Sequence, residues 1–195
     1  YCPSAVNCPT FPDTNKTSVD WVAAGAVTPV KDQGQCGSCW AFSTTGVLEG
    51  YYFLKTGILL SFSEQQIIDC EKDCQGCNGG WPHLAINYSA VYGLELEKIY
   101  PYTGHTSKTC KYQQALAIKM TTGYQCIAQK SLPQMQAAVA MQPVSIAVEA
   151  DQDAWQNYDS GILDFGCGAD LDHGVLITGF NNKTQSWTVK NSWGS

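Results

Sequence analysis

The chain has 195 residues, of which 44% are hydrophobic and 14% are charged, and its formal net charge is −6 at pH 7. This composition is typical of a compact globular protein with one sizeable core or two small ones. The acidic balance argues against nucleic acid or an anionic membrane as a partner, and no apolar run approaches the roughly 18 residues that cross a bilayer.

The first predicted element is a helix that begins at Ser38 and stops at Gly57. Side chains that form one apolar face recur there at spacings of three and four. They are Trp40, Thr44, Val47, Leu48, Tyr51 and Leu54. Cys39 then lies in the first turn, where the partial positive charge of a helix N-terminus lowers the pKa of a thiol.

A second cysteine precedes this helix, in the run QGQCGSCWAF at residues 33–42. One interpretation is a thiolate nucleophile at Cys39 with an amide donor, Gln33, six residues upstream. The C-x-x-C spacing of Cys36 and Cys39 also fits a redox pair or two zinc ligands. The spacing alone leaves these alternatives open.

Two more helices and three strands are predicted further along the chain. Ser63 and Gln66 have capping-box spacing, which predicts a helix over residues 63–70, and another helix is predicted over 82–92. Short β-branched or alternating runs predict antiparallel strands over residues 144–148, 174–180 and 186–190. We expect a helical domain over residues 24–124 and a β-rich domain formed by 1–23 and 125–195, with the active site between them.

Two motifs in the β-rich part decide how Cys39 is interpreted. His173 lies in the run LDHGVL and Asn191 in VKNSWG, roughly 130 and 150 residues after the cysteine. With these motifs the chain resembles papain-like cysteine proteases of the cathepsin L-like branch, from about residue 19 to its end. The resemblance includes the runs VDW (19–21), AVTPVK (26–31), SEQ (63–65), GCNGG (76–80) and YPY (100–102).

The resemblance implies an α+β, papain-like two-domain fold with a helical left domain, an antiparallel β-barrel-like right domain and a cleft between them. It implies that Cys39 is the nucleophile and that His173 holds and returns its proton. Asn191 would orient the imidazole, and Gln33 would help to bind the oxyanion. The positions that match substrate-binding residues of the family are Gly79, Gly80, Trp81, Pro82, Ala147, Leu171, Asp172, Gly174 and Trp193. Neither a metal nor another cofactor is implied.

The chain contains ten cysteines, which is typical of a protein from an oxidising compartment. The resemblance implies the disulfides Cys36–Cys77 and Cys70–Cys110 and a free Cys39. Each bridge closes a loop of about 40 residues and contributes roughly 3 to 4 kcal/mol in the loop-entropy model.

The other cysteines have no partner fixed by the resemblance. We expect Cys2 to pair with Cys8 and Cys74 with Cys126. Cys167 resembles a cysteine whose family partner lies in a C-terminal tail, so we expect the last strands and one pocket residue to be missing after residue 195. The first residue, which is not methionine, indicates a processed form that has lost a signal peptide and an inhibitory propeptide.

These features predict a cysteine endopeptidase that works through a thioacyl-enzyme intermediate and prefers an apolar residue two positions before the scissile bond. No insertion between Cys77 and Cys126 blocks the cleft, which predicts endopeptidase action. A transpeptidase or ligase using the same intermediate, or a non-catalytic structural subunit, remains an alternative. Expected partners are peptide and protein substrates, the propeptide and cystatin-type inhibitors.

The expected location is lysosomal or vacuolar, or outside the cell. Three Asn-x-Ser/Thr sequons, at Asn15, Asn87 and Asn182, are candidate glycan sites in a eukaryotic secretory route. Asn87 is the weakest of the three, because it falls within a predicted helix.

Overall fold

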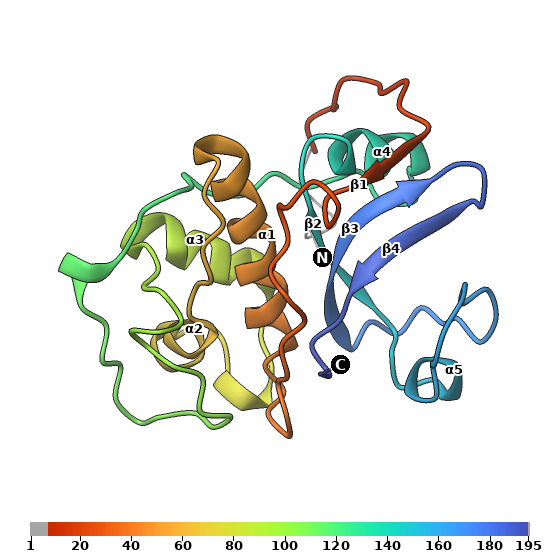
Figure 1. Ribbon diagram of the computed structural model, residues 1–195. Coiled ribbons are helices and arrows are strands. Elements are labelled where there is room, and N and C mark those ends of the chain that lie inside the picture. Colours follow the sequence, from red (N-terminus) through yellow and green to blue (C-terminus); the bar gives the residue numbers. More distant parts are fainter. Residues whose placement is uncertain (1–7, 195) are drawn as a thin grey trace.

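The computed structural model describes residues 8–194. Helices α1 to α3 gather on one side of the molecule and the four strands on the other (Figure 1). The helices are α1 (Cys39–Thr56), α2 (Glu64–Cys70), α3 (Pro82–Tyr92), α4 (Leu132–Val139) and α5 (Asp153–Gln156). The strands are β1 (Ser18–Asp20), β2 (Val144–Val148), β3 (His173–Asn181) and β4 (Ser186–Lys190), and two short 3-10 turns cover Gly76–Asn78 and Gln114–Leu116.

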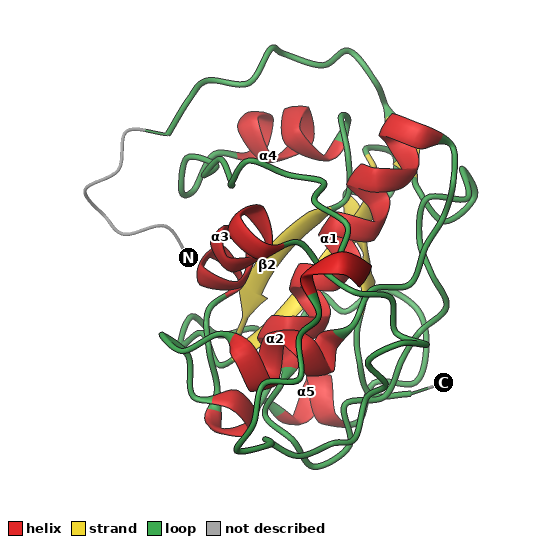
Figure 2. Cartoon of the chain, turned by 90° about the vertical axis from the view of Figure 1, so that its left-hand side faces the viewer, coloured by secondary structure: helices red, strands yellow, loops and turns green. Residues whose placement is uncertain are grey.

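Helix α1 lies between the sheet and the helices α2 and α3, and contacts α2, α3, β2 and β3 (Figures 1 and 2). Every residue from Trp40 to Gly50 is therefore buried, so this part of α1 is buried all round instead of on the single predicted apolar face. The expected place of Leu54 on that face is wrong, because Leu54 is 39% exposed in the last turn. The predicted stop is confirmed, because Gly57 has a φ of 75° and its N–H bonds the carbonyl of Phe53.

The sheet is antiparallel throughout, with β3 as its central strand. β4 pairs with one edge of β3, while β2 and β1 pair with its first and last residues along the other edge. Ile177 and Phe180 of β3 pack with Val144 and with Val139 of α4 in a second core cluster. The pairing of Val148 with His173 fixes the start of β3, which carries the candidate histidine.

The three predicted helices and the three predicted strands are confirmed, with β3 one residue longer at each end than predicted. Ser63 caps α2, since its Oγ accepts the N–H of Gln66 at 2.9 Å. The return bond of a capping box is absent, because the Gln66 amide instead donates to the Tyr88 hydroxyl and the Gly93 carbonyl. The buried amide thereby ties α2 to the second half of α3 and to the residue that follows it.

Two of the disulfides, Cys36–Cys77 and Cys70–Cys110, match the pairing implied by the resemblance. The expected pairing of Cys8 and Cys126 with other cysteines is wrong, because these two bond each other. The segment that starts at residue 8 runs beside α4, where the backbone N–H of Phe11 bonds the Gln134 side chain, and this brings Cys8 to Cys126. Cys2, the expected partner of Cys8, lies outside the described residues.

Cys74, the expected partner of Cys126, is a free thiol in the described part of the chain, and its sulfur accepts the backbone N–H of Trp81 at 3.4 Å. None of the described helices is both long enough and apolar enough to cross a membrane.

Candidate active site

Cys39 lies at the first residue of α1, at the end of a loop that a disulfide holds in place. The disulfide joins Cys36 to Cys77, and the N–H of Gly37 bonds the Cys77 carbonyl at 2.9 Å. A Cβ on Gly37 would lie 2.6 Å from that carbonyl oxygen, so only glycine fits here. Because Cys36 is bonded to Cys77, it is not available as a redox partner or a zinc co-ligand of Cys39.

Burial raises the pKa of the Cys39 thiol, although the backbone N–H groups of Gly174 and Trp40 favour the thiolate and act in the opposite direction. The lowered pKa that we expect from the helix N-terminus alone is therefore not found in the free protein. Gly174 reaches this position because it has no side chain, since a Cβ there would lie 3.2 Å from the Cys39 carbonyl oxygen.

His173 is the first residue of β3 and is 8% exposed. Its Nε2 lies 2.7 Å from Oδ1 of Asn191. An amide oxygen can only accept, so Nε2 carries the hydrogen and Nδ1 keeps its lone pair. Burial lowers the pKa of His173, while the bond to Asn191 acts in the opposite direction. The Trp193 ring covers the imidazole, with the ring centroids 4.8 Å apart.

Gln33 is buried beside this helix start, and its side-chain amide is held at both ends. Its Nε2 donates to the Cys36 carbonyl at 3.0 Å, and its Oε1 accepts the Ser192 hydroxyl at 2.6 Å. The backbone N–H of Gln33 also bonds the Ser192 carbonyl at 2.8 Å. Ser192 thus fixes which end of the Gln33 amide faces the cysteine loop. No sequence motif pointed to this role, although Ser192 neighbours Asn191 in the sequence.

The two glycines of the expected substrate strand differ in their surroundings. Gly79 has a φ of 113° and nothing within 4 Å of a Cβ position. A Cβ on Gly80 would lie 2.6 Å from the Trp40 ring, which is 1% exposed. The space at Gly79 is thus open to a ligand, whereas the space at Gly80 is filled by the protein itself.

The other expected substrate-binding residues come from the start of α3, from β2 and from the segment that leads into β3. Trp81 and Leu171 are 40% and 47% exposed, and Ala147 pairs with Gly174 in the sheet. Pro82 begins α3 directly after Trp81. The Asp172 carboxylate accepts the N–H groups of Ala150 and Asp151 at 2.7 and 3.1 Å, so it holds the segment after β2. The described residues contain no cluster of three or more acidic, histidine or cysteine side chains that could hold a metal.

Comparison of the sequence with known proteins gives consistent matches. The profile of a family described as papain family cysteine protease matches residues 15–195. Procathepsin L of Rattus norvegicus is 47% identical over 188 residues, which cover 91% of this chain and 56% of that protein. Digestive cysteine proteinase 1 of Homarus americanus is 45% identical over 200 residues, which cover 98% of this chain and 62% of that protein. The chain spans little more than half the length of these relatives.

Solved structures give the same result. The cysteine protease CMS1MS2 of Carica candamarcensis, in complex with E-64, matches with a TM-score of 0.86 and 42% identity, over 92% of this chain and 83% of that one. Digestive procathepsin L 3 of Tenebrio molitor larval midgut matches with a TM-score of 0.88 and 38% identity, over 96% of this chain and 64% of that one. Both likenesses extend over more than nine-tenths of this chain.

Proposed function

The chain belongs to the papain family of cysteine proteases and has the α+β fold of that family, and we propose from this that it is a cysteine endopeptidase. The observation that carries the proposal is the 2.7 Å bond from His173 to Asn191 at the start of β3. That bond leaves Nδ1 of the imidazole able to accept a proton, and the backbone N–H of the next residue, Gly174, favours the Cys39 thiolate.

In the proposed reaction Cys39 passes its proton to His173 as the sulfur attacks the peptide carbonyl. The oxyanion then forms near the backbone N–H of Cys39 and the side-chain amide of Gln33. His173 returns the proton to the leaving amine, which gives a thioacyl-enzyme. Water, deprotonated by His173, attacks the thioester, releases the acid and restores the thiol. Asn191 acts throughout by holding the imidazole plane, and Trp193 shields that bond from water.

Labelling tests the nucleophile. An epoxide inhibitor should modify the enzyme at Cys39 and nowhere else, as mapped by peptide mass spectrometry. Cys39→Ser and His173→Ala should each abolish turnover while circular dichroism stays unchanged. Modification of Cys74 or Cys167 instead, or turnover by Cys39→Ser, would contradict the assignment.

We propose further that the cleft is open at both ends and that apolar residues are preferred two positions before the cut. The residues that would line the pocket for this substrate residue are uncharged: Trp81, Pro82, Ala147, Leu171 and Gly174. An apolar pocket discriminates against a substrate side chain whose charge has no partner there. Quenched peptides capped at both termini should be cleaved, with Leu, Val or Phe favoured over Arg at this position. Release of dipeptides only would contradict the open cleft. Equal cleavage of peptides with Arg two positions before the cut would contradict the apolar preference.

We also propose that the substrates are peptides and proteins, and that a propeptide and cystatin-type inhibitors block the enzyme. Its proposed location is lysosomal, vacuolar or extracellular. Support for the propeptide and the location comes from relatives named procathepsin L and digestive cysteine proteinase. Addition of a synthetic propeptide to the active enzyme, followed by residual activity, tests the inhibitory partner directly.

A further inference from the structure

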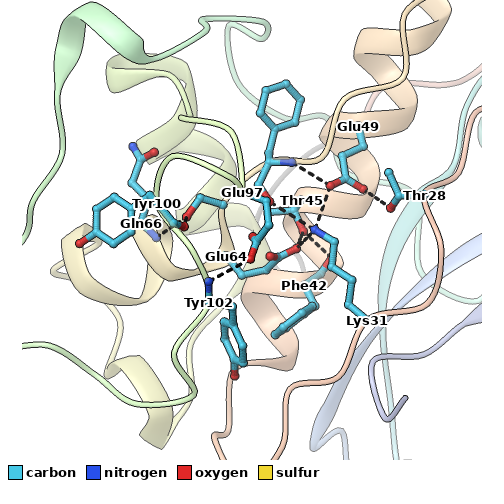
Figure 3. A network of polar contacts seen from close by, with 12 residues as sticks. Thr28, Lys31, Phe42, Thr45, Glu49, Glu64, Gln66, Glu97, Tyr100 and Tyr102 are labelled. Atoms are coloured by element: carbon cyan, nitrogen blue, oxygen red, sulfur yellow. Dashed lines mark hydrogen bonds and ion pairs between the residues drawn. The ribbon is translucent and has the colours of Figure 1, made fainter. Parts of the chain in front are cut away.

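A network of charged side chains joins Lys31, in the segment before α1, to Glu49 of α1 and Glu64 of α2 (Figure 3). The Lys31 ammonium donates to Glu49 Oε1 at 3.2 Å and to Glu64 Oε1 at 2.6 Å. Both carboxylate side chains are 1% exposed. From β4, the Lys190 ammonium bonds the Thr28 hydroxyl at 2.8 Å, and that hydroxyl donates to Glu49 Oε2 at 2.6 Å.

Glu64 and Glu97 meet inside this network. Glu64 Oε1 accepts the Thr45 hydroxyl as well as Lys31, and Glu97 Oε1 accepts the backbone N–H of Tyr102 at 2.9 Å. The second oxygen of each carboxyl, Oε2, is buried and receives no hydrogen bond from a donor among residues 8–194. The two carboxyls are in hydrogen-bonding contact with each other and lie side by side in Figure 3.

Two ionised carboxylates cannot bond each other, because both offer acceptors only. With all groups ionised, the ammonium groups of Lys31 and Lys190 face three carboxylates, those of Glu49, Glu64 and Glu97. The network, in which Glu49 and Glu64 are buried and the other three residues are half-buried, would then carry one excess negative charge, and burial makes an unpaired charge costly. One proton between the two unpartnered oxygens removes the excess negative charge. The same proton supplies the hydrogen-bond donor that both oxygens lack.

Tyr102 is the other titratable side chain that faces the pair. Burial and the carboxylates of Glu64 and Glu97 raise its pKa, although its bond with Ser38 acts in the opposite direction, so its phenol stays neutral in the relevant range. Lys31 also stays charged, since the neighbouring carboxylates outweigh burial and raise its pKa. The proton that neutralises the network therefore belongs to the carboxyl pair.

We propose that a proton held on Glu64 Oε2 bonds the neighbouring Glu97 carboxyl, and that this proton makes the folded protein lose stability as the pH rises from acidic to neutral. Burial, outweighing the opposing effect of Lys31 and reinforced by Glu97, raises the pKa of Glu64 from 4.5 to about 7. The unfolded chain releases this proton near pH 4.5, whereas the folded chain keeps it to about pH 7. The stabilisation is therefore complete below pH 4.5 and is lost as the pH rises through 7.

Other groups contribute to the pH dependence, so the test must isolate the pair. Burial raises the pKa of Glu49, which acts with the same sign. Burial lowers the pKa of His173, which acts with the opposite sign at acidic pH. Lys190, whose pKa burial lowers, titrates at more alkaline pH. A variant that removes the shared proton but keeps Glu49, His173 and Lys190 is therefore needed to isolate the contribution of the carboxyl pair to the pH dependence of stability.

Glu97→Gln is such a variant. Its amide Nε2 donates to Glu64 Oε2 without a shared proton, and its Oε1 still accepts the N–H of Tyr102. Glu95→Gln is the matched control, because Glu95 lies two residues away, is buried, and accepts the N–H of Gln113 through its carboxylate. All variants are made in the full chain with Cys39→Ser, which prevents self-digestion.

Denaturant unfolding is measured at pH 5, 6, 7 and 8. In the Cys39→Ser parent and in Glu95→Gln the unfolding equilibrium constant should rise at least tenfold between pH 5 and pH 8, within a limit of roughly 300-fold set by the pKa change. In Glu97→Gln the increase of the unfolding equilibrium constant between pH 5 and pH 8 should be smaller than in the parent, by a factor of about ten or more. An unchanged rise in Glu97→Gln would overturn the proposal.

Infrared difference spectra between pH 6 and pH 8 give a second measurement that does not depend on a variant folding. The parent should show the carbonyl stretch of a protonated carboxylic acid at pH 6 that disappears at pH 8, and a folded Glu97→Gln should lack this band. Absence of the band from the parent at pH 6 would overturn the proposal even if Glu97→Gln failed to fold.

Discussion

Gln33 illustrates how a single residue can serve both the site and the fold. Its amide oxygen accepts the Ser192 hydroxyl at 2.6 Å, while its backbone carbonyl accepts the Tyr102 hydroxyl at 2.7 Å. With the oxygen held by Ser192, the NH2 group is turned toward the cysteine loop. A donor held in advance costs no reorganisation when charge develops on the substrate.

Gln33→Ala should lower kcat by about 10²-fold with little change in KM, because the lost donor acts on the transition state. Ser192→Ala should give a smaller loss of kcat, since the amide is present but free to turn, and Ser192→Thr should restore it. Steady-state kinetics on a peptide substrate measure all three. The exposed neighbour provides the control, so a comparable loss in Gln35→Ala would show that the loop, and not the amide, is responsible.

At the scale of elements, the 3-10 turn at Gly76–Asn78 and the glycines after it are shaped by α1. The Trp40 indole donates to the Gly76 carbonyl at 3.1 Å, and the ring fills the space where a Gly80 side chain would be. The sequence suggests that both Gly79 and Gly80 are bare so that a peptide can approach. Packing gives Gly80 a second reason to lack a side chain.

Gly80→Ala should therefore destabilise the protein by about 1 to 3 kcal/mol, because the Trp40 ring is buried and bonded and cannot yield. The free energy of unfolding from denaturant titration measures this cost. The cost should shrink when the same substitution is made in Trp40→Phe, where the ring is smaller. An equal cost in both backgrounds would place the strain elsewhere.

The elements that could be predicted are those with local signals. Gly57 ends α1 and Ser63 begins α2 through bonds to residues three or four positions away. β1, α4 and α5 could not be predicted, because neither α4 nor α5 begins with a side-chain cap and the three-residue β1 is defined by its pairing with β3. Motif spacing was enough to select Cys39, His173 and Asn191 as candidates.

Contacts between distant residues were beyond sequence reasoning. The bond of Ser192 to Gln33 joins residues 159 positions apart, and no periodicity indicates such a partner. The same holds for the Lys31 network, whose carboxylates come from separate helices. The Cys8–Cys126 bridge is a third case, since residue counts allow many pairings and only the fold chooses among them.

At the scale of the whole molecule, the bridge between Cys8 and Cys126 fastens the N-terminal segment to the β-rich side across 118 positions. Further along this segment the Lys16 ammonium bonds the Ala140 carbonyl, and β1 pairs with the end of β3. The segment thus closes the sheet on the side away from α1. A long loop closed by a disulfide restricts the unfolded chain most strongly.

Replacing both cysteines, in Cys8→Ser/Cys126→Ser, should lower the free energy of unfolding by about 2 to 4 kcal/mol and leave kcat within about twofold of the parent. Unfolding in denaturant under oxidising conditions measures the loss. Under dithiothreitol the parent and the variant should converge, because the parent then lacks the bridge as well. A difference that persists after reduction would mean that the serines, and not the missing link, cause it.

Helix α1 joins the helical side to the sheet, since Trp40 and Val47 pack in the same cluster as Leu176 of β3. Freeing the cysteine at its end therefore requires this shared core to open, in one cooperative event. The protease that we propose would meet active copies of itself, and a chain is cut most readily where it opens locally. A helix shared in this way leaves no low-energy partial opening around Cys39, so we expect cleavage of one copy by another to require global unfolding.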